Sequence, residues 1–128
     1  MIIEHIAINI PDPVAAAKWY CDHLDMQIVR RFDEPPYIHF VADREKRGVL
    51  EIYSNPDAPV PDYTRMHPIT LHIAFEVDDL DATLQRLLAA GATAEGGVNT
   101  TPIGDQLVFL RDPWGVSLQL VKRAQPLL

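Results

Sequence analysis

The first half of the chain is repeated in the second half, and this repeat restricts the fold more than any other feature. Segment 5–12 (HIAINIPD) aligns with segment 72–79 (HIAFEVDD), 67 residues later. Apolar residues alternate with polar or small ones in both copies, which is typical of a strand with one packed face. The chain is therefore expected to contain one structural unit twice.

Each copy continues with the pattern of a helix and three more strands. Asp12 followed by Pro13 predicts one helix start, Asp78 or Asp79 predicts the other, and Gly91 is expected to end the second helix. The expected buried face of the first helix contains Val14, Ala17, Cys21 and Leu24. Strands are predicted at 26–31, 37–42, 49–53, 93–94, 106–110 and 116–121, with a turn at 96–97. The predicted fold class is α+β, with two βαβββ modules in tandem.

We expect a single domain over residues 1–128. Module one covers about 1–53, a proline-rich connector covers 54–68, and module two covers about 69–122. Prolines at positions 56, 59, 61 and 68 favour an extended connector over a helix or a central strand.

Composition limits the partners. The formal net charge is −7, which disfavours nucleic acid and anionic membrane surfaces. No apolar run approaches the ~18 residues needed to cross a bilayer. Cys21 has no second cysteine to pair with, and the first residues do not resemble a secretion signal. These observations predict a cytoplasmic protein whose partner is neither nucleic acid nor a membrane.

The repeat also duplicates a pair of polar residues. His5 precedes Glu51 by 46 residues, and His72 precedes Gln119 by 47. Glu51 and Gln119 each lie between apolar neighbours, so alternation points them away from the packed face. If both modules contribute to one concave face, two imidazoles, a carboxylate and an amide surround one point. Such a set suits Zn, Ni, Co, Mn or Fe(II).

These segments, together with 112–115 (DPWG) and 118–120 (LQL), resemble the vicinal oxygen chelate superfamily over about residues 2–122. That superfamily includes glyoxalase I, extradiol dioxygenases and bleomycin-binding proteins. The resemblance implies a cupped mixed sheet, a homodimer, and metal ligands at His5, Glu51, His72 and Gln119.

Two positions depart from the glyoxalase pattern. Gln119 stands where a glutamate is usual, and an amide cannot accept a proton, so the general base is Glu51 or a metal-bound hydroxide. Asn9 stands where glutathione-using members often carry arginine, although Asn55 fits their pattern. The use of glutathione is therefore left open.

The preferred hypothesis is a metal-dependent lyase or isomerase that stabilises an enediolate-type intermediate on a substrate with two neighbouring oxygens, with Glu51 moving the proton. Asn9, His39, Tyr53 and Asn55 are the candidate substrate-binding residues. Two alternatives stay open: an Fe(II)-dependent extradiol-type dioxygenase, and a metal-free small-molecule binding or resistance protein.

Overall fold

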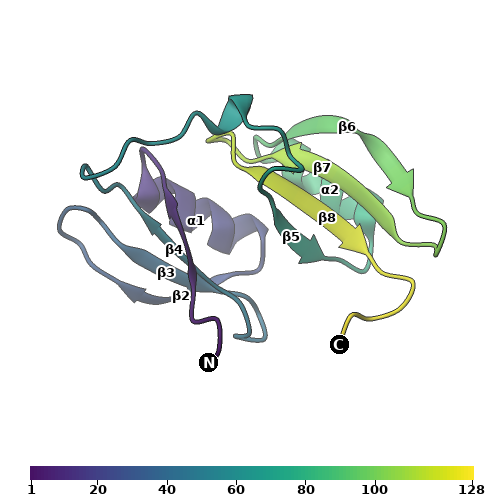
Figure 1. Cartoon of the computed structure of the whole chain (residues 1–128), viewed down its shortest axis with the longest axis horizontal. Helices are drawn as coiled ribbons and strands as arrows, with labels where there is room; N and C mark the ends of the chain where they lie inside the picture. The colour runs from purple at the N-terminus through teal and green to yellow at the C-terminus, as the bar shows by residue number, and fades with distance from the viewer. The chain divides into compact units, whose positions relative to one another are not determined.

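A computed structural model describes all 128 residues, and the chain divides into two compact units, Met1–Pro61 and Asp62–Leu128 (Figure 1). The first unit contains β1 (Ile6–Asn9), α1 (Pro13–His23), β2 (Gln27–Arg31), β3 (His39–Ala42) and β4 (Val49–Tyr53). The second contains the 3-10 turn η1 (Tyr63–Arg65), β5 (Ile73–Glu76), α2 (Leu80–Ala89), β6 (Thr93–Thr100), β7 (Gln106–Arg111) and β8 (Ser117–Lys122). The prediction of two βαβββ modules is confirmed.

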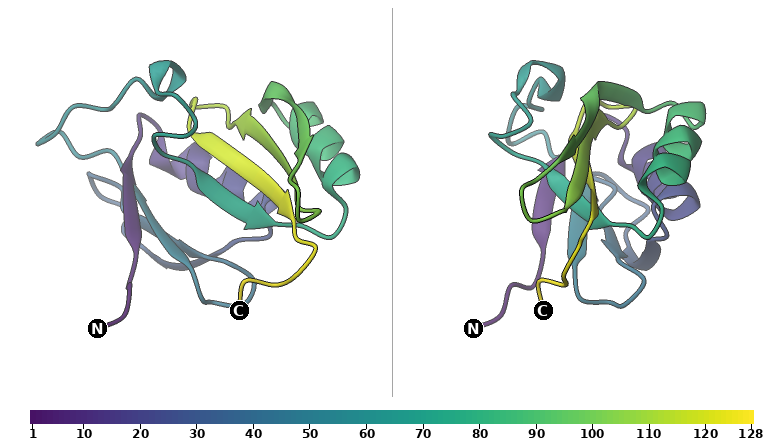
Figure 2. Two further views of the ribbon diagram at one scale, coloured as in Figure 1. Left: turned by 45° about the vertical axis from the view of Figure 1, so that its right-hand side comes forward. Right: turned by 90° about the vertical axis from the view of Figure 1, so that its right-hand side faces the viewer.

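Each unit forms its own four-stranded mixed sheet. The strand order is β1-β4-β3-β2 in the first unit and β5-β8-β7-β6 in the second. The first and last strands of each module pair in parallel, and the remaining pairs are antiparallel. In each module, the first strand therefore lies beside the last strand. Figure 2 shows the strands and helices from two further directions. None of the helices could cross a bilayer.

Each sheet has one apolar face packed on a helix. In the first unit the side chains of Ile8, Val41 and Ile52 are buried on that face, as are Ala17 and Tyr20 of α1. The opposite face, which we call the helix-free face, carries Ala7, Phe40 and Glu51 at neighbouring positions of three strands. Its counterpart in the second unit carries Ala74, Phe109 and Gln119. The two helix-free faces are therefore built alike.

The helix ends follow the sequence signals. Asp12 caps α1 by accepting a hydrogen bond from the Ala15 backbone, and Asp79 caps α2 in the same way through Ala82. Gly91 follows α2 with a φ of +102°, a conformation that glycine adopts without strain.

Three local predictions were wrong. The buried residues of α1 are Pro13, Ala16, Ala17, Trp19 and Tyr20, whereas Val14 is exposed. The connector is not wholly extended, because η1 forms within it. Gly96 and Gly97 lie within β6, where the register with β7 shifts between Glu95 and Asn99. The glycines therefore mark a bulge in a longer strand rather than its end.

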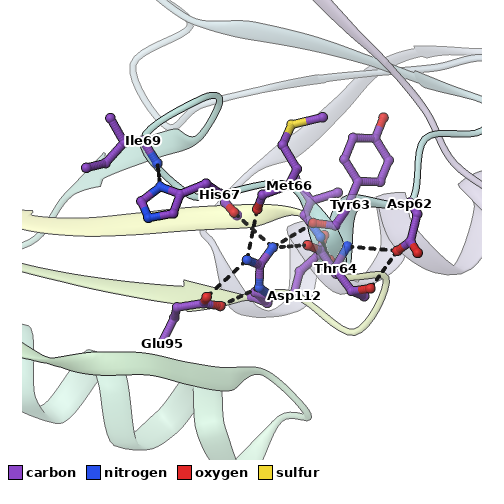
Figure 3. Close-up of polar contacts among 12 residues, drawn as sticks. Asp62, Tyr63, Thr64, Met66, His67, Ile69, Glu95 and Asp112 are labelled. Atoms are coloured by element: carbon purple, nitrogen blue, oxygen red, sulfur yellow. Dashed lines mark hydrogen bonds and ion pairs between the residues drawn. The ribbon is translucent and has the colours of Figure 1, made fainter.

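Arg111 fixes the last part of the connector; Figure 3 labels its partners Tyr63, Met66 and Glu95. Its guanidinium donates to the backbone oxygens of Tyr63, Met66 and Gly115 at 2.7, 3.0 and 3.1 Å. It also pairs with Glu95, whose pKa it lowers by hydrogen bonding to the carboxylate. This buried arginine therefore ties η1, β6, β7 and the turn before β8 together.

Gly115 is required where this turn meets η1. Its φ is +86°, and a Cβ added there would lie 2.6 Å from Thr64 Cγ2 and 3.2 Å from the Thr64 backbone nitrogen. We expect Gly115→Ala to lower the free energy of unfolding by about 2–4 kcal/mol, from backbone strain and steric overlap together. Denaturant titration measures this value.

Gly96→Ala is the matched control for this prediction. Gly96 has a similar φ of +78°, but an added Cβ would meet no atom within 4 Å. Gly96→Ala should therefore lower the free energy of unfolding only through backbone strain, by about 1–2 kcal/mol. Equal losses in the two variants would contradict the role assigned to the Thr64 contact.

Candidate functional site

His5 and Glu51 form a pair on the helix-free face of the first unit. His5 immediately precedes β1, and Glu51 is the central residue of β4, whose register partner is Ala7. His5 Nε2 lies 3.2 Å from Glu51 Oε2. The Glu51 side chain is 15% exposed and that of His5 is 34% exposed. The carboxylate is thus largely shielded from solvent but still accessible.

His72 and Gln119 occupy the corresponding positions in the second unit. His72 immediately precedes β5, and Gln119 pairs in register with Ala74, as Glu51 pairs with Ala7. Both side chains are partly buried. The duplication predicted from the sequence therefore extends to strand register, and each unit offers one imidazole and one side-chain oxygen.

Sequence reasoning missed a phenylalanine beside each histidine. Phe40 is the register partner of Glu51, and its ring meets His5 edge to face with centroids 5.6 Å apart. Phe109 is the partner of Gln119 and meets His72 in the same way at 5.2 Å. Each phenylalanine restricts its imidazole and provides an apolar neighbour to the polar pair. The signal available was the matching position of a phenylalanine in the two modules.

Hydrogen bonds orient both imidazoles in the same sense. His72 Nδ1 lies 2.8 Å from the carbonyl oxygen of Pro68, which can only accept, so Nδ1 carries the hydrogen. His5 Nδ1 bonds to the Glu4 carboxylate, which raises the pKa of His5 above its ordinary value, with a further contribution from Glu51. In the neutral form of each ring the Nε2 lone pair is then available to a ligand.

Asn9 and Tyr53 also lie on the helix-free face, because they are register partners two residues beyond Ala7 and Glu51. The Asn9 amide donates to the carbonyls of Asn55 and Ala58 at 3.0 Å each, and its oxygen accepts from the Asn55 backbone at 2.8 Å. Asn9 and Asn55 thus hold the start of the connector. Tyr53 is partly buried beside them.

His39 lies on the opposite side of the sheet from Glu51. It is the register partner of Ile52, and it is buried with Val41 on the face packed against α1. Its Nδ1 bonds to the carbonyl oxygen of Tyr37 at 2.7 Å. The structure therefore does not bring His39 together with the His5–Glu51 pair.

The predicted ligand set divides into one pair per unit. No three histidine, cysteine, aspartate or glutamate side chains gather into a group that could hold a metal ion. Each pair nevertheless fits a divalent cation chemically, because an imidazole nitrogen that has lost its proton and a carboxylate or amide oxygen are ligands for such ions.

Comparison with known proteins identifies similar chains. The family model for the Glyoxalase/Bleomycin resistance protein/Dioxygenase superfamily matches residues 2–120. An uncharacterized Bacillus subtilis protein, YwkD, is 30% identical over 125 residues, covering 94% of this chain and 96% of YwkD. A lactoylglutathione lyase of Haemophilus influenzae is 25% identical over 128 residues, covering 95% and 93%. A solved glyoxalase family structure from Bacillus cereus has a TM-score of 0.80 at 16% identity, covering 95% and 93%, and supports the fold.

Proposed function

The chain belongs to the glyoxalase/bleomycin resistance protein/dioxygenase superfamily, and from this membership we propose that it is a metal-dependent lyase or isomerase. Its substrate is a small molecule with two neighbouring oxygens, and the protein acts as a cytoplasmic homodimer. The observation that carries the proposal is the 3.2 Å approach of His5 Nε2 to Glu51 Oε2, with His72 and Gln119 at the corresponding positions of the second unit.

His5, Glu51, His72 and Gln119 would hold the divalent ion, which is Zn, Ni, Co, Mn or Fe(II). When bound, such an ion acts as a Lewis acid that stabilises negative charge developing on the substrate oxygens. The Nδ1 bonds of the histidines to Glu4 and to the Pro68 carbonyl fix the rings with Nε2 available for this purpose.

Glu51 is the proton carrier in this proposal. Among the four residues it alone has a carboxylate, and a glutamine at position 119 cannot accept a proton. Glu51 removes the proton from the hydroxyl-bearing carbon next to the substrate carbonyl, which gives an enediolate, and returns it to the former carbonyl carbon. The hydroxyl proton passes to the former carbonyl oxygen, so that the carbonyl and the hydroxyl exchange places. Phe40, directly across from Glu51, reduces access of water to the carboxylate on this side.

Glutathione is one substrate component to be tested, because the Haemophilus influenzae relative of this chain is a lactoylglutathione lyase. Asn9 stands where glutathione-using members often carry arginine, and its amide already bonds to the connector backbone. A glutathione contact at Asn9 would have to replace those bonds. Substrates with and without a thiol component are therefore both required in the assay.

Metal addition tests the proposal directly. Protein stripped with a chelator should gain about 2.7 kcal/mol of stability when the correct ion is present at ~100 times its dissociation constant. The melting temperature should rise by roughly 10 °C. His5→Ala and His72→Ala should each abolish most of this shift, whereas His67→Ala, an exposed histidine of the connector, should retain it.

The same metal-loaded samples distinguish the competing functions. Isomerisation of the hemithioacetal of methylglyoxal and glutathione, or of a thiol-free hydroxyketone, supports the proposal. Oxygen consumption with catechols by the Fe(II) form, without isomerisation, indicates a dioxygenase instead. If no divalent ion changes the melting temperature, the metal-dependent proposal is wrong and a small-molecule binding protein is the better description.

A further inference from the structure

Arg30 lies on the helix-free face of the first unit, in the strand next to Phe40. The pairing of β2 with β3 shifts between Ile28 and Arg30, so that Val29 is an extra residue. Arg30 then becomes the register partner of Phe40, which is itself the partner of Glu51. The bulge thus brings a guanidinium into the same row as the proposed proton carrier.

Arg30 makes no ion pair within the chain. Its neighbour Arg31 is the register partner of His39, on the other face, and pairs with Asp33 at 3.3 Å. Arg30 is exposed, and β3 separates it from Glu51. Across two strand spacings the Cα atoms of Arg30 and Glu51 are about 9–10 Å apart. The guanidinium is therefore available to a molecule lying across Phe40.

In the second unit, the charged residue at the equivalent position forms an ion pair within the chain. Glu95 of β6 faces Phe109, as Arg30 faces Phe40, and its carboxylate is bound by Arg111 at 3.1 Å. In the first unit Ala42 occupies the place of Arg111 in the pairing of the third and fourth strands. The two units match at the histidines and phenylalanines, but only the first presents an unpaired charge beside them.

We propose that Arg30 determines specificity by binding a terminal carboxylate of the substrate whose reacting carbon lies at Glu51. The planar guanidinium matches a carboxylate with two parallel hydrogen bonds. The chain carries a net charge of −7, so an anionic substrate needs such a local cation. The inference rests on the proposed function for the position of the reacting carbon, and it adds the substrate class, a small carboxylic acid with two neighbouring oxygens.

Two hydroxamates test this inference. A hydroxamate presents two neighbouring oxygens, and succinic acid monohydroxamate adds a terminal carboxylate that is absent from butyrohydroxamate. Calorimetric titration of the metal-loaded protein should show the carboxylate probe binding about tenfold more tightly. Arg30→Gln should remove most of this preference, and Arg30→Lys should keep part of it. Added salt should weaken the preference because Arg30 is exposed.

Arg31→Gln is the matched control, since it removes the same charge from the adjacent residue on the opposite face. It should leave the preference intact. An equal preference in the wild type and Arg30→Gln, or an equal loss in Arg31→Gln, overturns the assignment. If butyrohydroxamate binds but the preference is absent, only the inference about Arg30 fails. If neither probe binds with any of the divalent ions, the proposed function fails as well.

Discussion

Glu51→Gln is expected to lower turnover by about 10²- to 10⁴-fold, the range for loss of a positioned general base. The substitution keeps the shape of the side chain and removes its ability to accept a proton. It also removes the negative charge 3.2 Å from His5 Nε2, so the affinity for a divalent ion should fall in parallel. The free energy of unfolding should change by less than about 1 kcal/mol, because the pair with His5 is partly exposed.

The duplicated geometry allows a stricter version of this experiment. Gln119 holds the position in the second unit that Glu51 holds in the first, with an alanine and a phenylalanine as register partners in both. The double variant Glu51→Gln with Gln119→Glu restores one carboxylate and one amide. It should recover metal affinity to within about tenfold of the wild type and part of the turnover.

The control for both variants is Glu45→Gln. Glu45 lies in the loop between β3 and β4 and pairs with Arg47 at 2.8 Å, with both side chains exposed. Glu45→Gln removes the same charge as Glu51→Gln, but at a position away from the helix-free face. This variant should therefore leave turnover unchanged. Wild-type turnover in Glu51→Gln would show that this carboxylate is not the base.

Arg111→Met is expected to lower the free energy of unfolding by about 3–5 kcal/mol, the range for breaking a buried charged network. Methionine replaces the apolar part of the side chain but cannot donate to the carbonyls of Tyr63, Met66 and Gly115. Those acceptors and the Glu95 carboxylate lose their partner together. Arg111→Lys should recover only part of the loss, because an ammonium cannot reproduce the planar set of donors.

Urea unfolding with Arg47→Met as a control isolates this effect. Arg47 pairs with Glu45 on the surface, with side chains 67% and 57% exposed, and such pairs contribute at most about 1 kcal/mol. The Arg111 variant should therefore unfold at a much lower urea concentration than the Arg47 variant. Similar midpoints would mean that the connector does not depend on the guanidinium.

The repeat at 5–12 and 72–79 was sufficient to predict the two modules and to select the paired candidate ligands. Alternation with a period of two placed Glu51 and Gln119 away from the apolar face of their own strands, and the register confirms this. Local capping chemistry likewise predicted the starts of both helices, at Asp12 and at Asp78 or Asp79, and the structure has Asp12 and Asp79 as the caps. These features depend on neighbouring residues, which the sequence displays.

Pairing between strands was not predictable in the same way. Alternation groups His39 with Val41 on one face of β3, but it does not say whether that face meets α1 or carries Glu51. The extra residue Val29 changes the face of every later residue of β2, and so decides the placement of Arg30. Gly96 and Gly97 resemble a turn in the sequence. In the structure β6 continues past them because it pairs with β7, and this pairing joins residues that are separated in the sequence.

The sequence by itself determined the two modules, their helix starts and the four candidate ligands, because each follows from local periodicity and from the internal repeat. Only the tertiary structure decided which residues lie beside those ligands. Phe40, Phe109 and Arg30 reach their positions through hydrogen-bonded registers between strands distant in sequence, and a shift of one residue moves a side chain to the other face.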